Sequence, residues 1–273
     1  MKNLISRVLS AIAAILILFV VIYKFNVVGI YGLILFVVVR GSYELARMLF
    51  NKKFPHEAIY LFIITNTATF FLITQDSLKK FALLFLILGF FLSILYGVLF
   101  HRRFSNLDSI LNFISLFCLG SIYTSIIPAT VAWIVLRPVD GMNWFFCLLT
   151  VVFAGDIGAY LFGVTMGKNK IAPTLSPNKS LQGALGGLTF SLIAALGFST
   201  ILTDTPMWIL IICGLFGGAL GQIGDFFESL IKRVSGVKDS GSIMPGHGGV
   251  LDRLDGILMA APLFYFAAYY HSL

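Results

Sequence analysis

The sequence predicts an all-α, polytopic integral membrane protein with about nine transmembrane helices. Hydrophobic residues make up 59% of its 273 residues, and charged residues make up only 11%. Soluble domains average roughly 45–50% apolar and about 25% charged residues, so the composition excludes a water-soluble globule. The apolar residues also form long unbroken runs, which predict helices and not the alternating strands of a membrane barrel.

Nine runs have the length and composition expected of membrane helices. They cover residues 8–24, 27–40, 58–75, 81–100, 110–136, 143–166, 184–203, 207–228 and 254–271. The first run resembles a secretory signal, but no small-residue cleavage site leads into a polar domain, so we interpret it as the first helix. Only Lys24 to Asn26 separate it from the second run. The fifth run is long, and we expect either a kink at Pro128 or a tilted or interfacial piece before it.

The basic residues predict the orientation in the membrane. If the N-terminus is cytoplasmic, all but four of the 19 Lys and Arg residues fall on the cytoplasmic side. The four exceptions are Lys24, Lys79, Lys80 and Arg137. Because cytoplasmic loops carry the excess of Lys and Arg, we expect the N-terminus inside and the C-terminus outside. The net charge of +7 then mostly reflects the basic cytoplasmic loops that set the membrane orientation. It does not indicate a nucleic-acid partner.

The unusual polar residues and much of the glycine lie in the second half of the chain. We therefore expect a scaffold of helices over 1–142, lipid-facing and suited to dimer formation. A catalytic transmembrane domain is expected over 143–273, with cytoplasmic loops at 167–183 and 229–253. Asp156 lies within the sixth run, and a carboxylate at membrane depth is costly, which indicates a functional role. A helix-packing hydrogen bond or an ion pair with a lysine is the alternative.

Small residues recur every four positions around Asp156, at Gly155, Ala159, Gly163 and Gly167. Such a stripe lets a second helix approach closely, and we interpret it as a packing surface. The loop that follows carries Lys168, Lys170 and Lys179 among Ser176, Ser180 and two prolines. Lysine and hydroxyl groups suit phosphate, although a cytoplasmic loop has the same composition for topological reasons alone.

Acidic residues close the eighth run and open the ninth. Asp225 and Glu228 are three residues apart, hence on one helical face, and they repel one another unless a cation or a proton relieves them. Asp252 and Asp255 repeat this spacing at the start of the ninth run. Carboxylates on adjacent helix ends can bind Mg²⁺, with substrate phosphates as the remaining ligands. The alternative is that the acids at the start of the ninth run are there because the helix dipole favours negative charge.

The segment between these acids contains both basic residues and a glycine-rich run. Its basic residues are Lys232, Arg233, Lys238 and Arg253, and Pro245 to Gly249 reads P-G-H-G-G. Backbone amides of Gly246, Gly248 and Gly249 can approach and cradle an anion. His247 is a candidate base, but a histidine in a glycine turn is more often a hydrogen-bond donor or a packing residue.

Cations, glycines and carboxylates without a nucleophile motif favour phosphoryl or nucleotidyl transfer, in which the substrate supplies the attacking oxygen. A transporter is the alternative of a different class, because Asp156 and the glycine-interrupted helices would suit a substrate pathway. Against it, the polar residues gather at one interface and no paired repeat is visible.

The segment from Ser229 to Asp255 resembles the signature of the phosphatidate cytidylyltransferase family, also called CDP-diacylglycerol synthases, in order and spacing. The runs D-I-G-A-Y-L-F-G, from Asp156, and S-P-N-K-S, ending at Ser180, resemble the family's other motifs, with Ser180 where Thr is expected. The resemblance covers residues 151–256 well and implies an enzyme that makes CDP-diacylglycerol and pyrophosphate from CTP and phosphatidic acid with Mg²⁺. It also implies a homodimer in the cell membrane, with its active site at the cytoplasmic face. Another CTP-dependent lipid-phosphate cytidylyltransferase is the nearest alternative.

The resemblance then implies a role for each candidate residue. Asp225 and Asp252 hold Mg²⁺, and a second cation is allowed, with Asp255 and Asp156 as further ligands or as residues that orient the ligands. The phosphates are neutralised by Lys232, Arg233, Lys238 and Arg253, with Lys179 and Ser180 approaching from the neighbouring loop. Of these, Asp225, Asp252, Lys238 and Arg253 are the predicted catalytic residues, and His247 is grouped with the glycines that bind CTP.

Overall fold

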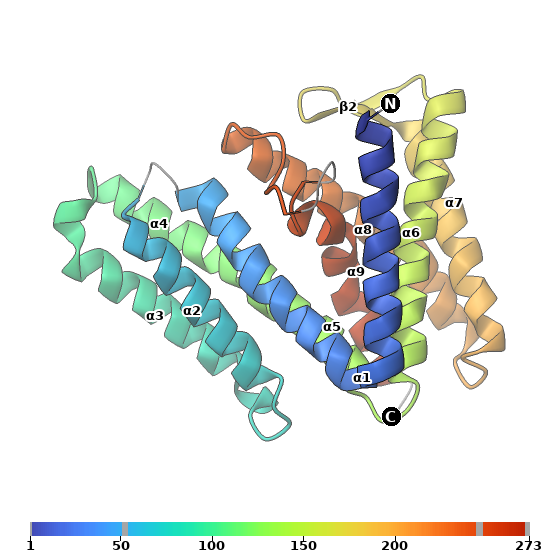
Figure 1. The fold of residues 1–273 in the computed structure, drawn as a ribbon, viewed down its shortest axis with the longest axis horizontal. Helices are drawn as coiled ribbons and strands as arrows, with labels where there is room; N and C mark the ends of the chain where they lie inside the picture. The colour runs from blue at the N-terminus through green and yellow to red at the C-terminus, as the bar shows by residue number, and fades with distance from the viewer. Residues whose placement is uncertain (1, 51–53, 244–247, 271–273) are drawn as a thin grey trace. The chain divides into compact units, whose positions relative to one another are not determined.

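The computed structural model describes residues 2–50, 54–243 and 248–270, and it confirms an all-α polytopic membrane fold (Figure 1). The chain divides into two compact units. The first unit comprises Met1–Ala132 with Ser235–Asp252, and the second comprises Trp133–Val234 with Arg253–Leu273. The sequence prediction placed all of 143–273 in one domain. The difference arises because the segment Ser235–Asp252 is hydrogen-bonded to the first helix of the chain.

The helices follow the predicted runs closely. They are α1 (Lys2–Phe50), α2 (His56–Ile73), α3 (Ala82–Leu99), α4 (Leu107–Ser121), α5 (Ile127–Val135), α6 (Gly141–Met166), α7 (Leu181–Gly197), α8 (Met207–Val234) and α9 (Leu251–Tyr270). Single turns of 3₁₀-helix lie at Lys79–Phe81, His101–Arg103 and Phe198–Thr200. Helix α8 is longer than predicted, so Lys232 and Arg233 lie on a helix and the loop begins only after Val234.

Seven helices in the described part of the chain are long and apolar enough to cross a membrane, against nine predicted runs. One difference is α1, which joins the first two runs. Its path breaks at Asn26, whose φ of 50° and ψ of −134° are not helical. Figure 1 draws α1 as two arms. Asparagine tolerates positive φ better than most residues, which suits this break. The other difference is α9, whose first turns carry Asp252, Arg253 and Asp255.

The first unit packs its helices around aromatic side chains. The rings of Phe50, Phe62, Phe113 and Phe117 are fully buried and meet mostly edge to face, with centroids 5.1–5.7 Å apart. The predicted fifth run is α4 and α5, joined by a π-helical turn at Ile122–Ile126. That turn ends just before Pro128, which has no N–H to donate to the preceding turn, so the disruption precedes the proline.

The second unit packs α6, α7 and α8 through small residues, which confirms the predicted packing stripe. A side chain at Gly155 would meet the Ser191 hydroxyl on α7, and one at Gly183 would meet the carbonyl of Ala159 on α6. Ser191 also donates a hydrogen bond from Oγ to the carbonyl of Val151, at 2.9 Å. The backbones therefore approach closely enough for a hydroxyl to bridge two helices.

The predicted loop between α6 and α7 contains a small antiparallel sheet. Strands β1 (Lys170–Ala172) and β2 (Ser176–Ser180) pair with Lys170 opposite Ser180. The sequence analysis expected a cytoplasmic loop here and did not foresee the hairpin. Pro173 lies in the turn and Pro177 in β2, a short edge strand where a missing N–H is tolerated.

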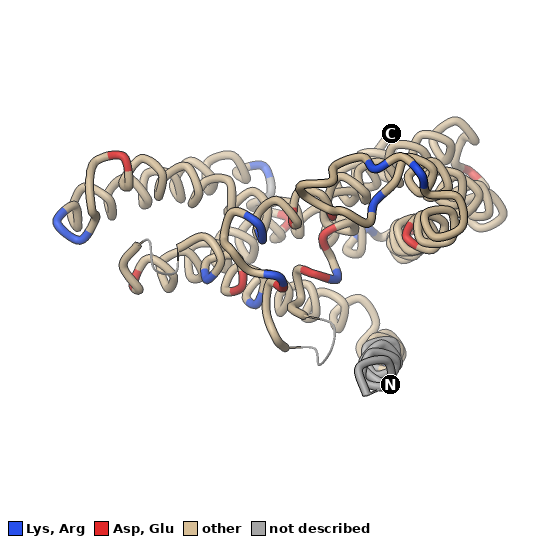
Figure 2. The backbone as a smooth tube through the Cα atoms, turned by 90° about the horizontal axis from the view of Figure 1, so that it is seen from above, with Lys and Arg blue, Asp and Glu red and all other residues tan. Residues whose placement is uncertain are grey.

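The surface outside the packed cores is apolar. Helix α3 alone exposes Leu83, Phe91, Leu95 and Val98 by 53–70%. Figure 2 shows long stretches of helix without a charged residue. Large exposed apolar surfaces are what a lipid environment accommodates and water does not.

The orientation is open to a direct test by cysteine labelling. Cys118, Cys147 and Cys213 are first replaced, and single cysteines are then introduced at three exposed positions. Thr174→Cys and Ser242→Cys are expected to react only from the cytoplasmic side, and Ser77→Cys only from the outside, because of the distribution of Lys and Arg. Labelling of Thr174→Cys and Ser242→Cys from the outside would reverse the proposed topology.

Candidate active site

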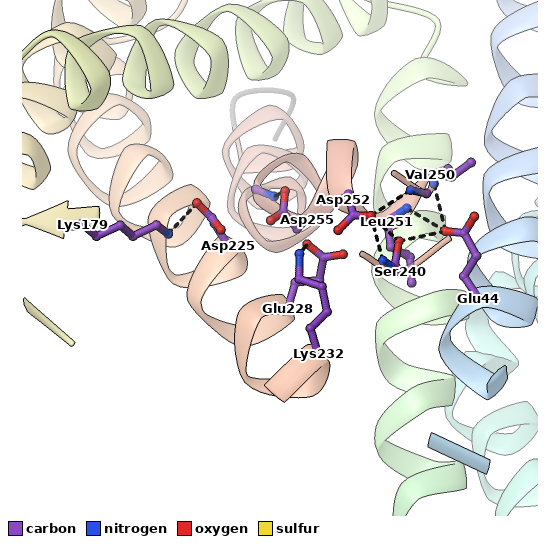
Figure 3. A network of polar contacts seen from close by, with 12 residues as sticks. Glu44, Lys179, Asp225, Glu228, Lys232, Ser240, Val250, Leu251, Asp252 and Asp255 are labelled. Carbon is purple, nitrogen blue, oxygen red and sulfur yellow. Dashed lines mark hydrogen bonds and ion pairs between the residues drawn. The ribbon is translucent and has the colours of Figure 1, made fainter. Parts of the chain in front are cut away.

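In the first unit, Asp252 organises the loop that leads into α9. Its Oδ2 accepts three hydrogen bonds, from Ser240 N at 2.8 Å, Ser240 Oγ at 2.9 Å and Gly249 N at 2.8 Å (Figure 3). The carboxylate also lies in the first turn of α9, where the helix dipole favours negative charge. One oxygen of Asp252 therefore closes the loop.

Gly248 of this loop is required by the same carboxylate. Gly248 has a φ of +83°, and a Cβ there would collide with Asp252 Oδ2, so only glycine fits. The amide of Gly249, predicted to bind a phosphate, donates instead to Asp252. An anion can take this amide only in exchange for Asp252. Gly246 and His247 lie outside the described residues.

A buried acid that the sequence analysis did not single out holds the same loop. Glu44 on α1 is 1% exposed, and its Oε2 accepts hydrogen bonds from Val250 N at 2.9 Å and Leu251 N at 3.1 Å (Figure 3). Its Oε1 pairs with Arg40 Nε at 3.2 Å. In the sequence this looks like an ordinary surface pair spaced i,i+4, and only the apolar neighbours Leu45 and Ala46 hint at burial.

In the second unit, Lys179 and Asp225 form an ion pair. The Nζ of Lys179, on β2, lies 2.5 Å from Oδ2 of Asp225 on α8, and also 4.0 Å from the centre of the Phe226 ring (Figure 3). The Asp225 side chain is half-exposed, at 46%. The sequence predicted both residues for the site, and the hairpin brings them together.

Two further predicted acids, Asp156 and Asp255, interact electrostatically with Asp225. The negative charge of Asp225 acts on the carboxyl groups of both Asp156 and Asp255, and the positive charges of Lys179 and Arg253 act on Asp156. Asp255 also accepts a hydrogen bond from the amide of Gly256 at 2.9 Å. Like charges gathered in this way favour the binding of a cation.

These acids fit a Mg²⁺ site only if the substrate completes it. Among the described residues, no three acidic, His or Cys side chains lie close enough to hold a metal by themselves. Mg²⁺ is usually held by one or two carboxylates together with substrate phosphates and water, so the donor chemistry fits. Asp225, Asp255 and Asp156 belong to the second unit, and Asp252 belongs to the first.

The remaining predicted residues differ in exposure and in their hydrogen-bond and ion-pair partners. Lys238, Arg233 and Arg253 are exposed. Arg233 Nε also donates to the carbonyl of Leu175 at 3.5 Å. Lys232 pairs with the buried Glu228 at 3.0 Å, one helical turn away. Ser180 is buried and its Oγ accepts from Gly183 N at 3.2 Å, so its hydroxyl caps α7.

Gly224, next to Asp225, sets the distance between α8 and α9. A Cβ at this position would collide with the backbone carbonyl of Asp255. Gly224→Ala is expected to lower the free energy of unfolding by about 1–3 kcal/mol, because backbone must move to make room. The measurement is Tm in detergent. Gly197→Ala is the matched control, since no heavy atom lies within 4 Å of its Cβ position. Equal Tm values for the two variants would contradict the close contact.

Comparison with known proteins adds an independent observation. A family model described as "Cytidylyltransferase family" matches residues 5–271. A phosphatidate cytidylyltransferase of Bacillus subtilis is 33% identical over 280 aligned positions, which cover 97% of this chain and 98% of that protein.

Relatives of the same name in two staphylococci are more similar over a shorter region. The protein of Staphylococcus saprophyticus is 39% identical and that of Staphylococcus haemolyticus 38% identical, each over 174 residues. The match spans 63% of this chain and 64% of either relative.

Proposed function

The chain belongs to the cytidylyltransferase family, and we propose that it is a phosphatidate cytidylyltransferase, which condenses CTP with phosphatidic acid to CDP-diacylglycerol and pyrophosphate. The observation that carries the proposal is the family match over residues 5–271, which includes every candidate residue described above. The staphylococcal and Bacillus relatives bear this name. The arrangement of cations and carboxylates supports the same chemistry.

The reaction needs charge neutralisation more than it needs a base. The phosphomonoester of phosphatidic acid has a second pKa near about 6, so it is largely a dianion at neutral pH. One of its oxygens forms a bond to the α-phosphorus of CTP, and the bond from that phosphorus to the bridging oxygen breaks as pyrophosphate leaves. The protein's task is then to align two polyanions and offset their repulsion.

The chain's own cations and acids divide this task. Lys238 and Arg253 are exposed on either side of the loop in sequence and are assigned to the phosphates. Lys179, now paired with Asp225, is assigned to phosphate as well and would exchange that partner for the substrate. Asp225, Asp255 and Asp156 would hold Mg²⁺, which when bound neutralises phosphate charge and orients the leaving group. That Asp252 also binds the metal stays a prediction from the sequence.

We place the reaction at the cytoplasmic face of the cell membrane. Lys179, Lys238 and Arg253 lie on the side that the Lys and Arg distribution assigns to the cytoplasm, where CTP is present. The acyl chains of the substrate then remain in the bilayer. A homodimer is implied by the family resemblance, and the mass of the detergent-solubilised protein tests it.

The test is an assay of the purified full chain with labelled CTP, Mg²⁺ and a panel of lipid phosphates. The expected result is pyrophosphate release and a labelled lipid product with phosphatidic acid. A labelled product with another lipid phosphate alone would shift the assignment to a different cytidylyltransferase. Absence of pyrophosphate release with every lipid would overturn enzymatic function and favour a transporter.

A further inference from the structure

We propose that Glu44 is a positioning residue: its carboxylate holds Ser240, Gly241 and the Gly249–Leu251 segment at the start of α9, so that Asp252 and its neighbours keep one geometry. The observation is a single buried oxygen with three donors from these residues. Oε2 of Glu44 accepts from Ser240 Oγ at 3.2 Å, Val250 N at 2.9 Å and Leu251 N at 3.1 Å (Figure 3). The effect on turnover rests on the proposed function, but the effect on the loop does not.

Burial makes this arrangement costly unless the contacts are kept. A carboxylate removed from water loses its hydration and is retained only where donors replace it. Glu44 is 1% exposed, and Arg40 Nε supplies a further donor to Oε1 at 3.2 Å. The two oxygens therefore have different partners: Oε1 faces the arginine of its own helix, and Oε2 faces the loop and α9.

Ser240 connects Glu44 to Asp252. Its Oγ lies 3.2 Å from Glu44 Oε2 and 2.9 Å from Asp252 Oδ2. A hydroxyl has one hydrogen, so it donates to one of these carboxylates at a time. Two acids distant in sequence are thus linked through a single side chain. A shift of Glu44 would be passed to the Asp252 carboxylate by way of Ser240.

The glycines of the loop give a second and independent observation. A Cβ on Gly241 would lie 2.6 Å from Glu44 Oε1. A Cβ on Gly249 would collide with Glu44 Oε2. Two glycines of the loop are therefore in contact with Glu44 itself, and their lack of a side chain makes room for its carboxylate. The glycine-rich sequence serves this internal acid as well as any substrate.

The residues on either side of the loop explain why the contacts of Glu44 matter for the reaction. Lys238 and Asp239 immediately precede Ser240, and Arg253 immediately follows Asp252. Both ends of the loop that Glu44 holds are therefore flanked by residues assigned to phosphate binding. Residues that position charged groups act on the rate because small displacements weaken the interactions made in the transition state.

The experiment compares Glu44→Ala, Glu44→Gln and Ser42→Ala in the purified full chain. Ser42 is a matched control, because it is buried on the same helix and donates to Thr124 Oγ1 at 3.1 Å, away from the loop. Hydrogen–deuterium exchange of the peptide spanning 248–254 reports on the Val250 and Leu251 amides. Turnover, KM for CTP and Tm are measured in the same preparations.

Glu44→Ala is expected to speed exchange in that peptide about tenfold and to lower kcat about tenfold, since loss of a helix cap typically costs about 1 kcal/mol or more. Glu44→Gln keeps one oxygen acceptor and is expected to recover part of both effects. Ser42→Ala is expected to match the wild type in both. Should Glu44→Ala fail to fold, Glu44→Gln carries the comparison.

Exchange in the 248–254 peptide equal to that of Ser42→Ala would overturn the proposal. So would exchange that rises equally along α1, α2 and the loop, which indicates general destabilisation. Faster loop exchange with unchanged kcat would also overturn it, because the loop geometry would then be irrelevant to the reaction. If the wild type itself fails to use CTP, the proposed function is lost, while exchange still decides whether Glu44 holds the loop.

Discussion

Asp225→Asn is expected to reduce turnover by roughly three orders of magnitude or more while leaving the protein folded. The substitution preserves shape and removes a charge that pairs with Lys179 at 2.5 Å and acts on both Asp156 and Asp255. Losing a carboxylate from a metal site removes charge stabilisation worth several kcal/mol. The ion pair itself is half-exposed, so its loss costs little stability.

The measurement is pyrophosphate release across a Mg²⁺ titration, with Tm recorded beside it. Asp204→Asn is the matched control, because Asp204 is exposed in the connection between α7 and α8 and outside the candidate site. It is expected to keep wild-type turnover. Near-normal turnover of Asp225→Asn at any Mg²⁺ concentration would remove Asp225 from the metal assignment and leave it as a partner of Lys179.

Arg253→Lys is expected to lower kcat/KM for CTP by about ten- to a hundredfold without altering orientation in the membrane. Arginine presents a planar fork for bidentate phosphate contact, whereas lysine presents a compact charge. A charge-assisted hydrogen bond is worth about 1.5–3 kcal/mol. Topology requires only positive charge, so the substitution separates the two roles. Lys238→Met is expected to weaken CTP use in the same way with insertion unchanged.

Arg102→Lys provides the control, since Arg102 is exposed on a 3₁₀ turn of the first unit and has no assigned role in the site. Catalytic efficiency and side-specific cysteine labelling are measured on the same preparations. If Arg253→Lys and Lys238→Met both retain wild-type efficiency, the basic cluster serves topology alone and the phosphate site is wrongly placed.

Local chemistry made part of the site predictable from the sequence. Lysine beside a serine after a proline-rich turn, and paired acids at helix ends, are unusual in a chain that is 11% charged, so Lys179 and Asp225 stood out. The contact between them did not stand out, because it depends on a two-stranded hairpin that the sequence analysis did not foresee. The sequence also did not show that the Ser180 hydroxyl caps α7, while its contact with substrate stays a prediction.

Glu44 and Gly249 show what a single sequence conceals. Glu44 lies roughly 200 residues from the loop that it holds, at the end of an apolar run and four residues after an arginine. Nothing local distinguishes it from a solvated charge. Gly249 was predicted to offer its amide to a phosphate, and the structure shows that amide bound to Asp252. Hydrogen-bond partners between distant segments are chosen by packing, which composition and spacing do not report.

The sequence by itself determined the class of the protein and the position of nearly every helix. Hydropathy acts locally, because in lipid each apolar run must satisfy its own backbone hydrogen bonds as a helix. Only the tertiary structure decided that Ser235–Asp252 belongs with α1, that Lys179 meets Asp225, and that a buried glutamate holds the glycine loop. Those contacts join residues that are distant in sequence, and a buried charge is stable only where the completed fold supplies its donors.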